Sequence, residues 1–160
     1  MTHASTPAPR SMGCTCFRLR KATRQVTQIY DEHLAEFGLT VTQFSLLGHL
    51  RAMSGVGIGA LADVMVMDPT SLTRALRPLE RQGLVALRPD PSDRRARCVH
   101  LTDKGRSAYE TARAGWQRAQ DQIGDLLGDD ALPRLNAALD DLTARLRRPK
   151  PGGAMPERRG

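Results

Sequence analysis

A capped amphipathic helix predicted over residues 68–83 constrains this chain more than any other stretch. Asp68 suits the N-cap position, where its side chain accepts backbone N–H groups of the first turn, and Pro69 suits the first helical position. Apolar residues follow at i, i+3, i+4 and i+7: Leu72, Ala75, Leu76 and Leu79. Gly83 ends the helix as the residue after its C-cap.

The polar face of this helix suits DNA recognition. Short hydrogen-bonding side chains near its N-terminus would reach base edges in a major groove, and arginines farther along would bind guanines or phosphates. The predicted contact residues are Pro69, Thr70, Ser71, Thr73, Arg74 and Arg77. On this segment alone, an ordinary amphipathic surface helix is the simpler interpretation. The neighbouring segments must therefore distinguish a surface helix from a DNA-recognition helix.

Charge is unevenly placed along the 160 residues, which suffice for one domain with a real core. Residues 51–106 carry ten Lys and Arg against six Asp and Glu, whereas residues 107–144 carry three against seven. A basic patch on a compact module favours a polyanionic partner. The basic charge of residues 145–160 is explained equally well by binding to a polyanion and by a solubilising tail.

The chain shows no signal for a membrane or for secretion. It has no run of about 18 apolar residues, and its first residues lack the apolar core of a signal peptide. We therefore expect a cytoplasmic protein. Three cysteines make an odd count, which in that setting argues against a disulfide framework.

The segments around residues 68–83 predict a winged helix. A short helix precedes them by a tight turn, which is helix-turn-helix spacing, and another helix capped by Thr40 or Thr42 comes before a glycine-rich loop. The buried positions expected in these two helices are Phe44, Leu46, Leu47, Leu50, Leu61, Ala62, Val64 and Met65. After Gly83 the period changes to two, so residues 84–87 and 98–101 read as paired strands. The turn between them carries Arg94, Arg95 and Arg97, which makes the wing cationic.

Long helices are expected on both sides of the winged helix. One runs from Cys14 to Phe37, another from Asp103 to about Leu127, and a last one carries leucines as far as Leu146. Inward positions of the second are Tyr109, Ala112, Trp116, Ala119, Ile123 and Leu126. Such helices have few partners in their own chain, and a two-fold dimer is the commonest solution. A dimer also suits a duplex read as two half-sites.

The order of these elements and three local motifs resemble the MarR family of bacterial transcription regulators, over residues 14–146. The first motif spans residues 58–85 and contains LADVM, PTSLTRAL and LERQGLV. The second is Asp93-Arg94-Arg95, where the family has Asp-x-Arg, and the third is VHLTDKG over residues 99–105. The resemblance implies a mainly α fold with a small β-hairpin: a winged helix over about 40–102 and dimerisation helices at 14–37 and 103–147. Residues 1–12 are rich in Pro, Ser, Thr and Ala, and Pro149 with Gly152-Gly153 ends the last helix, so we expect 1–12 and the basic residues 148–160 to be disordered tails.

The resemblance also implies how DNA is bound. Arg95 reaches the minor groove from the wing tip, Asp93 holds the wing through an ion pair, and the recognition helix faces the major groove. The chemistry fits, because a narrow minor groove concentrates negative potential. Pro78 departs from a regular helix, so we leave Arg81 out of the predicted contacts.

A small aromatic or phenolic effector, bound between the dimerisation helices and the winged helix, is implied by the same resemblance. Candidate lining residues come from the first two helices: Arg20, Thr23, Arg24, Tyr30, His33, Gln43 and His49. A second trigger is oxidation of a cysteine, since some MarR-like regulators sense peroxide near the start of the first helix. The candidates are Cys14, Cys16 and Cys98. Metal-ligand spacing is absent, and we expect no metal and no cofactor.

These observations predict a homodimeric repressor that binds a pseudo-palindromic operator in double-stranded DNA and is released by a ligand. Two alternatives stay open: a cysteine-based redox-sensing regulator of the same fold, and a winged-helix protein-interaction module. An interaction module gives no reason for the Asp93-Arg94-Arg95 wing tip. The sequence has no glycine-rich phosphate loop and no G-x-S-x-G nucleophile motif, so we expect no enzyme.

Overall fold

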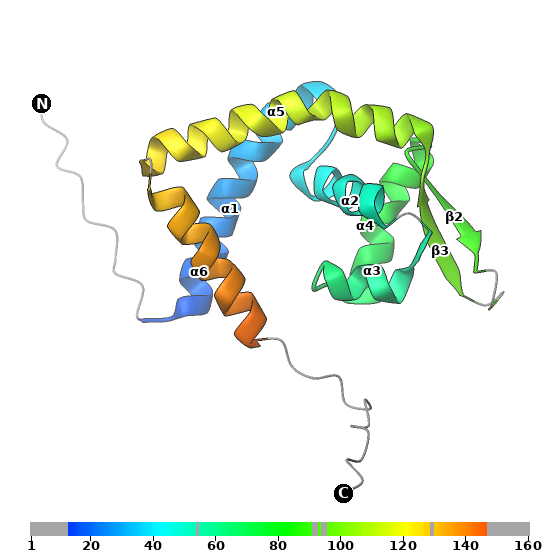
Figure 1. The fold of residues 1–160 in the computed structure, drawn as a ribbon, viewed down its shortest axis with the longest axis horizontal. Helices are drawn as coiled ribbons and strands as arrows, with labels where there is room; N and C mark the ends of the chain where they lie inside the picture. Colours follow the sequence, from blue (N-terminus) through cyan, green and yellow to red (C-terminus); the bar gives the residue numbers. More distant parts are fainter. Residues whose placement is uncertain (1–12, 54, 91–92, 94–95, 129, 147–160) are drawn as a thin grey trace, which may run out of the picture. The chain divides into compact units, whose positions relative to one another are not determined.

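The computed structural model describes residues 13–53, 55–90, 93, 96–128 and 130–146, and the tails predicted at 1–12 and 148–160 lie outside them. The described chain is mainly helical with one small antiparallel sheet, which confirms the predicted fold class (Figure 1). In chain order the elements are α1 (Thr15–Leu34), η1 (Ala35–Phe37), α2 (Val41–Ala52), β1 (Val56–Gly57), α3 (Ile58–Val64), α4 (Pro69–Arg81), β2 (Val85–Pro89), β3 (Arg97–Leu101), α5 (Asp103–Leu127) and α6 (Ala131–Leu146). None of the described helices is both long and apolar enough to cross a bilayer.

The chain divides into two compact units, one ending at Asp121 and the other beginning at Gln122. The first unit holds the hydrophobic core, which α1, α2, α3, α4, the sheet and α5 supply together. Its buried residues are Leu34, Leu39, Phe44, Leu46, Leu47, Leu50, Leu61, Ala62, Leu72, Leu76, Leu79, Leu84, Val85, Val99 and Ala112. The core positions predicted in α2 and on the stripe of α4 are among them, except that Ala75 is only partly buried.

The junction between α1 and α2 follows from local capping. The α-helix ends at Leu34, and one 3-10 turn carries the chain to Gly38, whose φ of 67° suits glycine. Thr40 is the N-cap of α2, because its hydroxyl accepts the Gln43 N–H while the Gln43 side chain accepts the Thr40 N–H. Of the two threonines predicted to cap this helix, Thr40 is therefore the one that does so.

Helix α3 is short and buries one narrow face. Leu61 and Ala62 are buried and Met65, just past the helix end, is partly buried, since i, i+1 and i+4 lie on the same side. Val64 was predicted to be buried, but it is 37% exposed. The prediction was wrong because Val64 lies to the side of the face that Leu61 defines.

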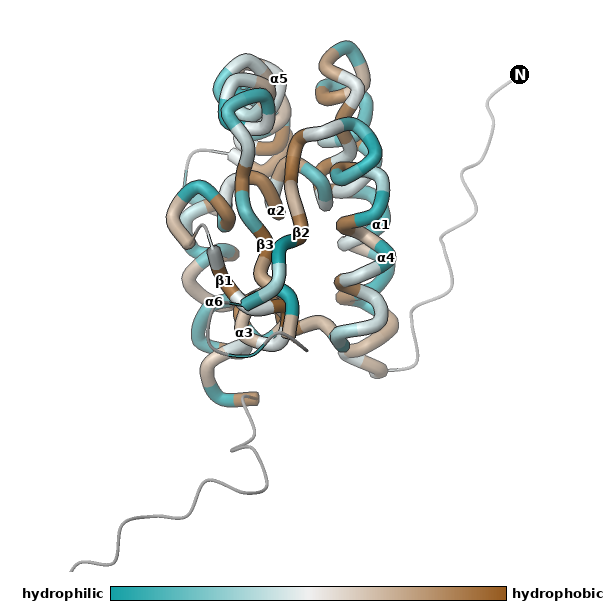
Figure 2. The backbone as a smooth tube through the Cα atoms, turned by 90° about the vertical axis from the view of Figure 1, so that its right-hand side faces the viewer, coloured by the Kyte–Doolittle hydropathy of each residue, from teal (hydrophilic) through white to brown (hydrophobic). Residues whose placement is uncertain are grey.

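Strand β1 was not predicted from the sequence. Its two residues pair antiparallel with β3, Val56 opposite Val99 and Gly57 opposite Cys98, so β3 lies between β1 and β2 (Figure 2). The sequence predicted only a glycine-rich loop between the two helices, whereas Val56 and Gly57 form β1 and α3 begins directly after them at Ile58. Two residues carry no periodic signal, and only the distant β3 makes them a strand.

The predicted hairpin is confirmed and is longer than expected. Strand β2 extends to Pro89, which pairs with Arg97, so both strands continue past their apolar residues. Proline is tolerated here because it stands at the end of a strand. Of the wing residues predicted to contact DNA, Asp93 and Arg97 are described, whereas Arg94 and Arg95 lie outside the described residues.

Helix α5 has the predicted bounds, and Ala112, Ala119 and Ile123 are buried in it as predicted. Leu126 was predicted to face inward but is 68% exposed. Within the second unit, α6 has no buried residue at all. The apolar stripe is thus present in α6, but among the described residues Leu135, Leu139 and Leu146 on it are exposed.

Candidate nucleic-acid interface

The N-terminus of α4 is fixed by its own first turn. The Asp68 side chain accepts the Ser71 N–H at 2.9 Å, and Pro69 occupies the first turn. Hydrogen bonds from the side chain and the backbone of Ser71 lower the pKa of Asp68 below its ordinary value. The cap therefore defines where α4 begins and which face of the helix is exposed.

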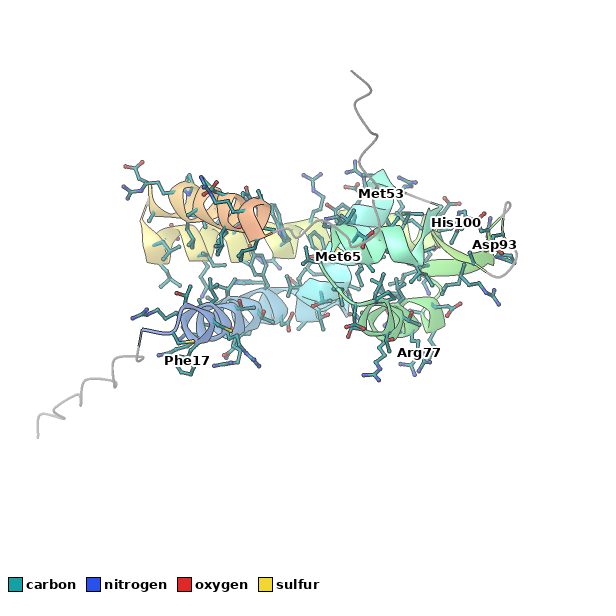
Figure 3. All side chains as sticks on the ribbon, turned by 90° about the horizontal axis from the view of Figure 1, so that it is seen from below. Phe17, Met53, Met65, Arg77, Asp93 and His100 are labelled. Atoms are coloured by element: carbon teal, nitrogen blue, oxygen red, sulfur yellow. The ribbon has the colours of Figure 1, made fainter. Side chains whose placement is uncertain are left out.

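The exposed face of α4 gathers most of the predicted DNA-contacting residues. Leu72, Leu76 and Leu79 bury the opposite side. Pro69, Thr70, Arg74 and Arg77 are exposed, and Ser71 and Thr73 are partly buried. Figure 3 shows Arg77 pointing away from the helix and from the core.

Thr73 is partly committed to the helix itself. Its hydroxyl donates to the Pro69 carbonyl at 2.8 Å, so its oxygen remains available only as an acceptor. A side chain in this state suits a base amino group and not a base carbonyl.

Arg81 was left out of the prediction because of Pro78. The helix nevertheless continues to Arg81, which is exposed and stands at i+4 from Arg77 on the same face. Pro78 has no N–H and so cannot donate to the carbonyl of Arg74. Leu76 and Leu79, on either side of it, are buried, and this packing keeps the segment helical without that bond. The basic part of this face is thus one turn longer than predicted.

The wing presents cations from both strands. Arg97 is exposed at the start of β3, and Arg88 is exposed in β2 opposite Cys98. Asp93 is exposed at the far end of the hairpin (Figure 3). Its implied ion pair with the wing stays a prediction, because Arg94 and Arg95 are outside the described residues.

The C-terminal end of α4 is bonded to the start of α5. The Thr102 hydroxyl lies 2.8 Å from the Gly83 carbonyl oxygen, and Lys104 Nζ donates to the Gln82 carbonyl at 2.8 Å. Carbonyls at a helix C-terminus lack partners within the helix, and these two are satisfied from α5. The orientation of α4 therefore depends on α5 as well as on the core.

Comparisons with known proteins assign the chain to a family. A model of the MarR family matches residues 39–96, which run from just before α2 into the loop between β2 and β3. The crystal structure of the M. tuberculosis transcriptional regulator MosR in complex with DNA is similar, with a TM-score of 0.73 and 34% identity. The match covers 82% of this chain and 95% of MosR. The chain belongs to the MarR family.

Two further similarities agree with this assignment. The transcriptional activatory protein BadR of Rhodopseudomonas palustris is 33% identical over 116 residues, and this chain spans 65% of the length of BadR and aligns over 71% of its own. A mutant of E. coli MarR complexed with operator DNA is 24% identical with a TM-score of 0.72, covering 79% of this chain and 91% of MarR, which supports the fold. This MarR-family protein is a transcriptional regulator with a DNA-binding winged helix, and it is not an enzyme.

A pocket of about 320 Å³ lies between α2 and α5 of this MarR-family protein. Three aromatic residues and three small residues line most of it, together with one histidine and one methionine. The lining residues are Phe44, Ser45, Gly48, His49, Ala52, Met53, Tyr109 and Trp116. The rings of Phe44 and Tyr109 stack with centroids 4.7 Å apart. Arg51 lies 5.8 Å from the centre of the Tyr109 ring and also forms an ion pair with Glu110 at 3.1 Å.

Only His49 of the predicted ligand residues lines this pocket. Arg20, Thr23 and Arg24 are exposed on α1, and Tyr30 and His33 are partly buried there. Burial raises the pKa of Tyr30. The Gln43 side chain completes the cap of α2. The prediction treated Tyr109 and Trp116 as core positions, since nothing in the sequence shows that α5 lies against α2.

The cysteines lie in two different places. Cys14 and Cys16 are exposed at the start of α1, whereas Cys98 in β3 is only 3% exposed. A hydrogen bond from the thiol to the Asp90 carboxylate raises the pKa of Cys98, and burial adds to the shift. Within the described ranges, no group of His, Cys, Asp and Glu is placed to hold a metal ion.

Proposed function

We propose that this protein is a homodimeric repressor that binds a pseudo-palindromic DNA operator and is released by a small ligand. The observation that carries the proposal is the exposed Thr70, Arg74 and Arg77 face of α4, which stands beside a wing with cationic strands. A recognition helix and a wing on one domain bind a duplex through two grooves.

Major-groove binding is supported by the arrangement of α4. Its capped N-terminus places Thr70 and Ser71 first, and exposed arginines follow along the same face. Arginine binds guanine O6 and N7 with two hydrogen bonds, and threonine contacts a thymine methyl or a base amino group. MosR was solved in complex with DNA, and the E. coli MarR mutant in complex with operator DNA.

Minor-groove binding is assigned to the wing, with Arg95 as the inserted side chain and Arg94 and Arg97 as flanking cations. Arg97 is exposed at the base of the wing loop, which fits contact with the phosphate backbone. Because arginine is attracted to a narrow minor groove, the wing would prefer DNA sequences that have one, without any hydrogen bond to a base.

Uncovered apolar surface supports the homodimer. In the first unit, Phe17 of α1 is 51% exposed, and in the second unit Leu126, Leu135 and Leu146 are exposed while α6 buries nothing. Exposed apolar helices of this kind are covered by another chain, and a second copy joined by a two-fold axis is the commonest partner. Two copies present two recognition helices to two half-sites.

A small aromatic or phenolic effector suits the pocket between α2 and α5. Phe44, Tyr109 and Trp116 supply ring contacts, and His49 supplies a polar group at the rim. The pocket lies against α5, which is bonded to the end of α4. A ligand that prefers one arrangement of α4 over another shifts operator affinity by that difference in binding free energy.

A redox trigger is the second candidate, because Cys14 and Cys16 are both exposed. In that case the double variant Cys14→Ser with Cys16→Ser loses release by peroxide. An unchanged peroxide response in this variant leaves the ligand as the trigger.

The test is genome-wide footprinting followed by gel retardation on the operator found. Arg95→Ala and Arg74→Ala should each weaken binding by about 1–3 kcal/mol while sedimentation shows the same dimer. Arg113→Ala is the control, since Arg113 is an exposed α5 arginine paired with Glu110.

Normal retardation by Arg95→Ala contradicts the wing assignment, and absence of any footprint favours a protein-interaction module. The relative BadR is named an activatory protein. Measuring transcription from the operator with and without this protein therefore decides whether it represses or activates.

A further inference from the structure

One carboxylate, that of Asp90, joins two parts of the wing. Its Oδ2 accepts the thiol proton of Cys98 with Sγ 3.1 Å away, and its Oδ1 accepts the Asp93 N–H at 3.2 Å. Asp90 follows directly after β2, Cys98 is the second residue of β3, and Asp93 belongs to the loop between them. The base of β3 and the loop are thus held by the same side chain.

Backbone hydrogen bonds close the loop at the same point. The Asp90 N–H donates to the Ala96 carbonyl at 3.0 Å, and the Ala96 N–H donates to the Asp93 carbonyl at 2.9 Å. With each carboxylate oxygen bonded to a different element, rotation of the Asp90 side chain costs one or both bonds. Asp90 therefore restricts how the loop leaves the sheet.

Cys98 is suited to anchor this arrangement. It is 3% exposed, and its neighbour Val99 belongs to the hydrophobic core, so the thiol is fixed relative to the sheet. The thiol acts here as a hydrogen-bond donor to a carboxylate, and such charge-assisted bonds are stronger than neutral ones. Its raised pKa disfavours the thiolate, which is the reactive form in oxidation.

We propose that Asp90 is a positioning residue, anchored through Cys98, that sets the orientation in which the wing presents its arginines to DNA. The inference rests on the proposed function of the wing in the minor groove. Asp90 itself contacts no DNA in this proposal. It raises affinity by holding the loop in one orientation before DNA binds. Less conformational entropy is then lost when the complex forms.

The chain offers nearly isosteric tests. Asp90→Asn keeps the shape but has one acceptor oxygen, so its amide group faces either the Cys98 thiol or the Asp93 N–H, both of which are donors. Cys98→Ala removes the donor, whereas Cys98→Ser restores one. Asp121→Asn is the control, because Asp121 is an exposed acid that accepts a hydrogen bond from Gln117 on α5.

The experiment measures operator binding by the full-length protein by fluorescence anisotropy over a series of salt concentrations. We expect Asp90→Asn and Cys98→Ala to bind about tenfold more weakly, the effect of one charge-assisted hydrogen bond. The slope of log K against log salt should become shallower by about one, as when a phosphate contact is lost. Cys98→Ser and Asp121→Asn should retain the affinity and the slope of the wild type.

Arg95→Ala and Arg97→Ala separate the two levels of the proposal. If these variants are weakened while Asp90→Asn and Cys98→Ala bind normally, the role of Asp90 is wrong and the wing assignment stands. If the arginine variants bind normally, the proposed function of the wing fails. If Cys98→Ser is as weak as Cys98→Ala, the loss comes from changed packing of Cys98 and not from its hydrogen bond to Asp90, which overturns the anchoring role of the thiol.

A measurement on the free protein covers the case in which Asp90→Asn does not fold. Hydrogen exchange of the Asp93 and Ala96 amides in the wild type should be slower than in Cys98→Ala and unchanged in Cys98→Ser. Equal exchange of both amides in wild type and Cys98→Ala overturns the proposal.

Discussion

Thr102 and Gly83 join the end of α4 to the start of α5, the helix that follows the wing. The Thr102 hydroxyl lies 2.8 Å from the Gly83 carbonyl oxygen and 3.0 Å from that of Leu84, and it accepts the Gly105 N–H at 3.0 Å. One side chain therefore caps the N-terminus of α5 and satisfies the end of α4. This contact links α4 directly to the helix that lines the α2–α5 pocket.

Replacement of Thr102 by valine should destabilise the protein. Valine keeps the shape but loses both hydrogen-bonding functions, so we expect the free energy of unfolding to fall by about 1–2 kcal/mol. Thr102→Ser keeps the hydroxyl and should stay within about 0.5 kcal/mol of the wild type. Urea denaturation measures both variants, and equal stability of Thr102→Val and wild type would show that the hydroxyl is not used.

Gly105 and Gly59 form a matched pair of helical glycines. A Cβ at Gly105 would lie 2.0 Å from the Leu84 carbonyl oxygen, which is a backbone atom, whereas a Cβ at Gly59 meets nothing within 4 Å. Gly105→Ala should cost about 3 kcal/mol, because the start of α5 must move away from β2. Gly59→Ala should be neutral or stabilise by about 0.5 kcal/mol. Thermal unfolding of the two variants gives the difference directly.

Val66 occupies a position that favours glycine. It follows α3 with a φ of 51°, its N–H donates to Asp63 and the Met67 N–H donates to Ala62, as at a helix end with a left-handed residue. The side chain is 72% exposed, so little packing is lost by replacing it. Val66→Asn should raise the free energy of unfolding by about 1 kcal/mol. Val64→Asn, within α3, should not raise it, and a gain in both variants would indicate a general effect of polarity.

Asp68 makes stability depend on pH in acid. Its pKa in the folded protein is lowered from the ordinary 3.8, first by the side chain of Ser71. The contribution to stability is therefore complete above the unfolded value and is lost as pH falls through the lowered folded value. The stability difference between wild type and Asp68→Ala should be constant near neutral pH and should shrink below about pH 4. A difference that persists unchanged at pH 2 would contradict the carboxylate as its cause.

Trp116 allows ligand binding to be observed without a label, because it is the chain's one tryptophan and lines the α2–α5 pocket. A series of monocyclic phenols and benzoic acids should change its fluorescence with saturation. Ala52→Leu, which fills the pocket from α2, should abolish the change. Ala114→Leu, at an exposed position of α5, is the control. Saturable binding that survives Ala52→Leu would place the ligand elsewhere.

Local physics determined what the sequence predicted correctly. The cap at Asp68, the leucine stripe of α4, the glycines at 38, 83 and 128 and the change of period at residue 84 act within a few residues, so the sequence alone shows them. They sufficed for the winged helix, for the bounds of α4 and α5 and for the polar face of α4. The family motifs then indicated a DNA-binding regulator.

Tertiary structure decided what depends on residues far apart in the chain. Val56 becomes a strand because Val99 lies opposite it, and α4 continues through Pro78 because leucines on both sides are buried. The pocket exists because α2 meets α5, and Leu126 is 68% exposed although it continues the apolar stripe of α5. The Asp90–Cys98 contact has the same origin, since β2 and β3 bring the two residues together across the wing. No local pattern encodes such pairings, because each arises from packing between separate elements.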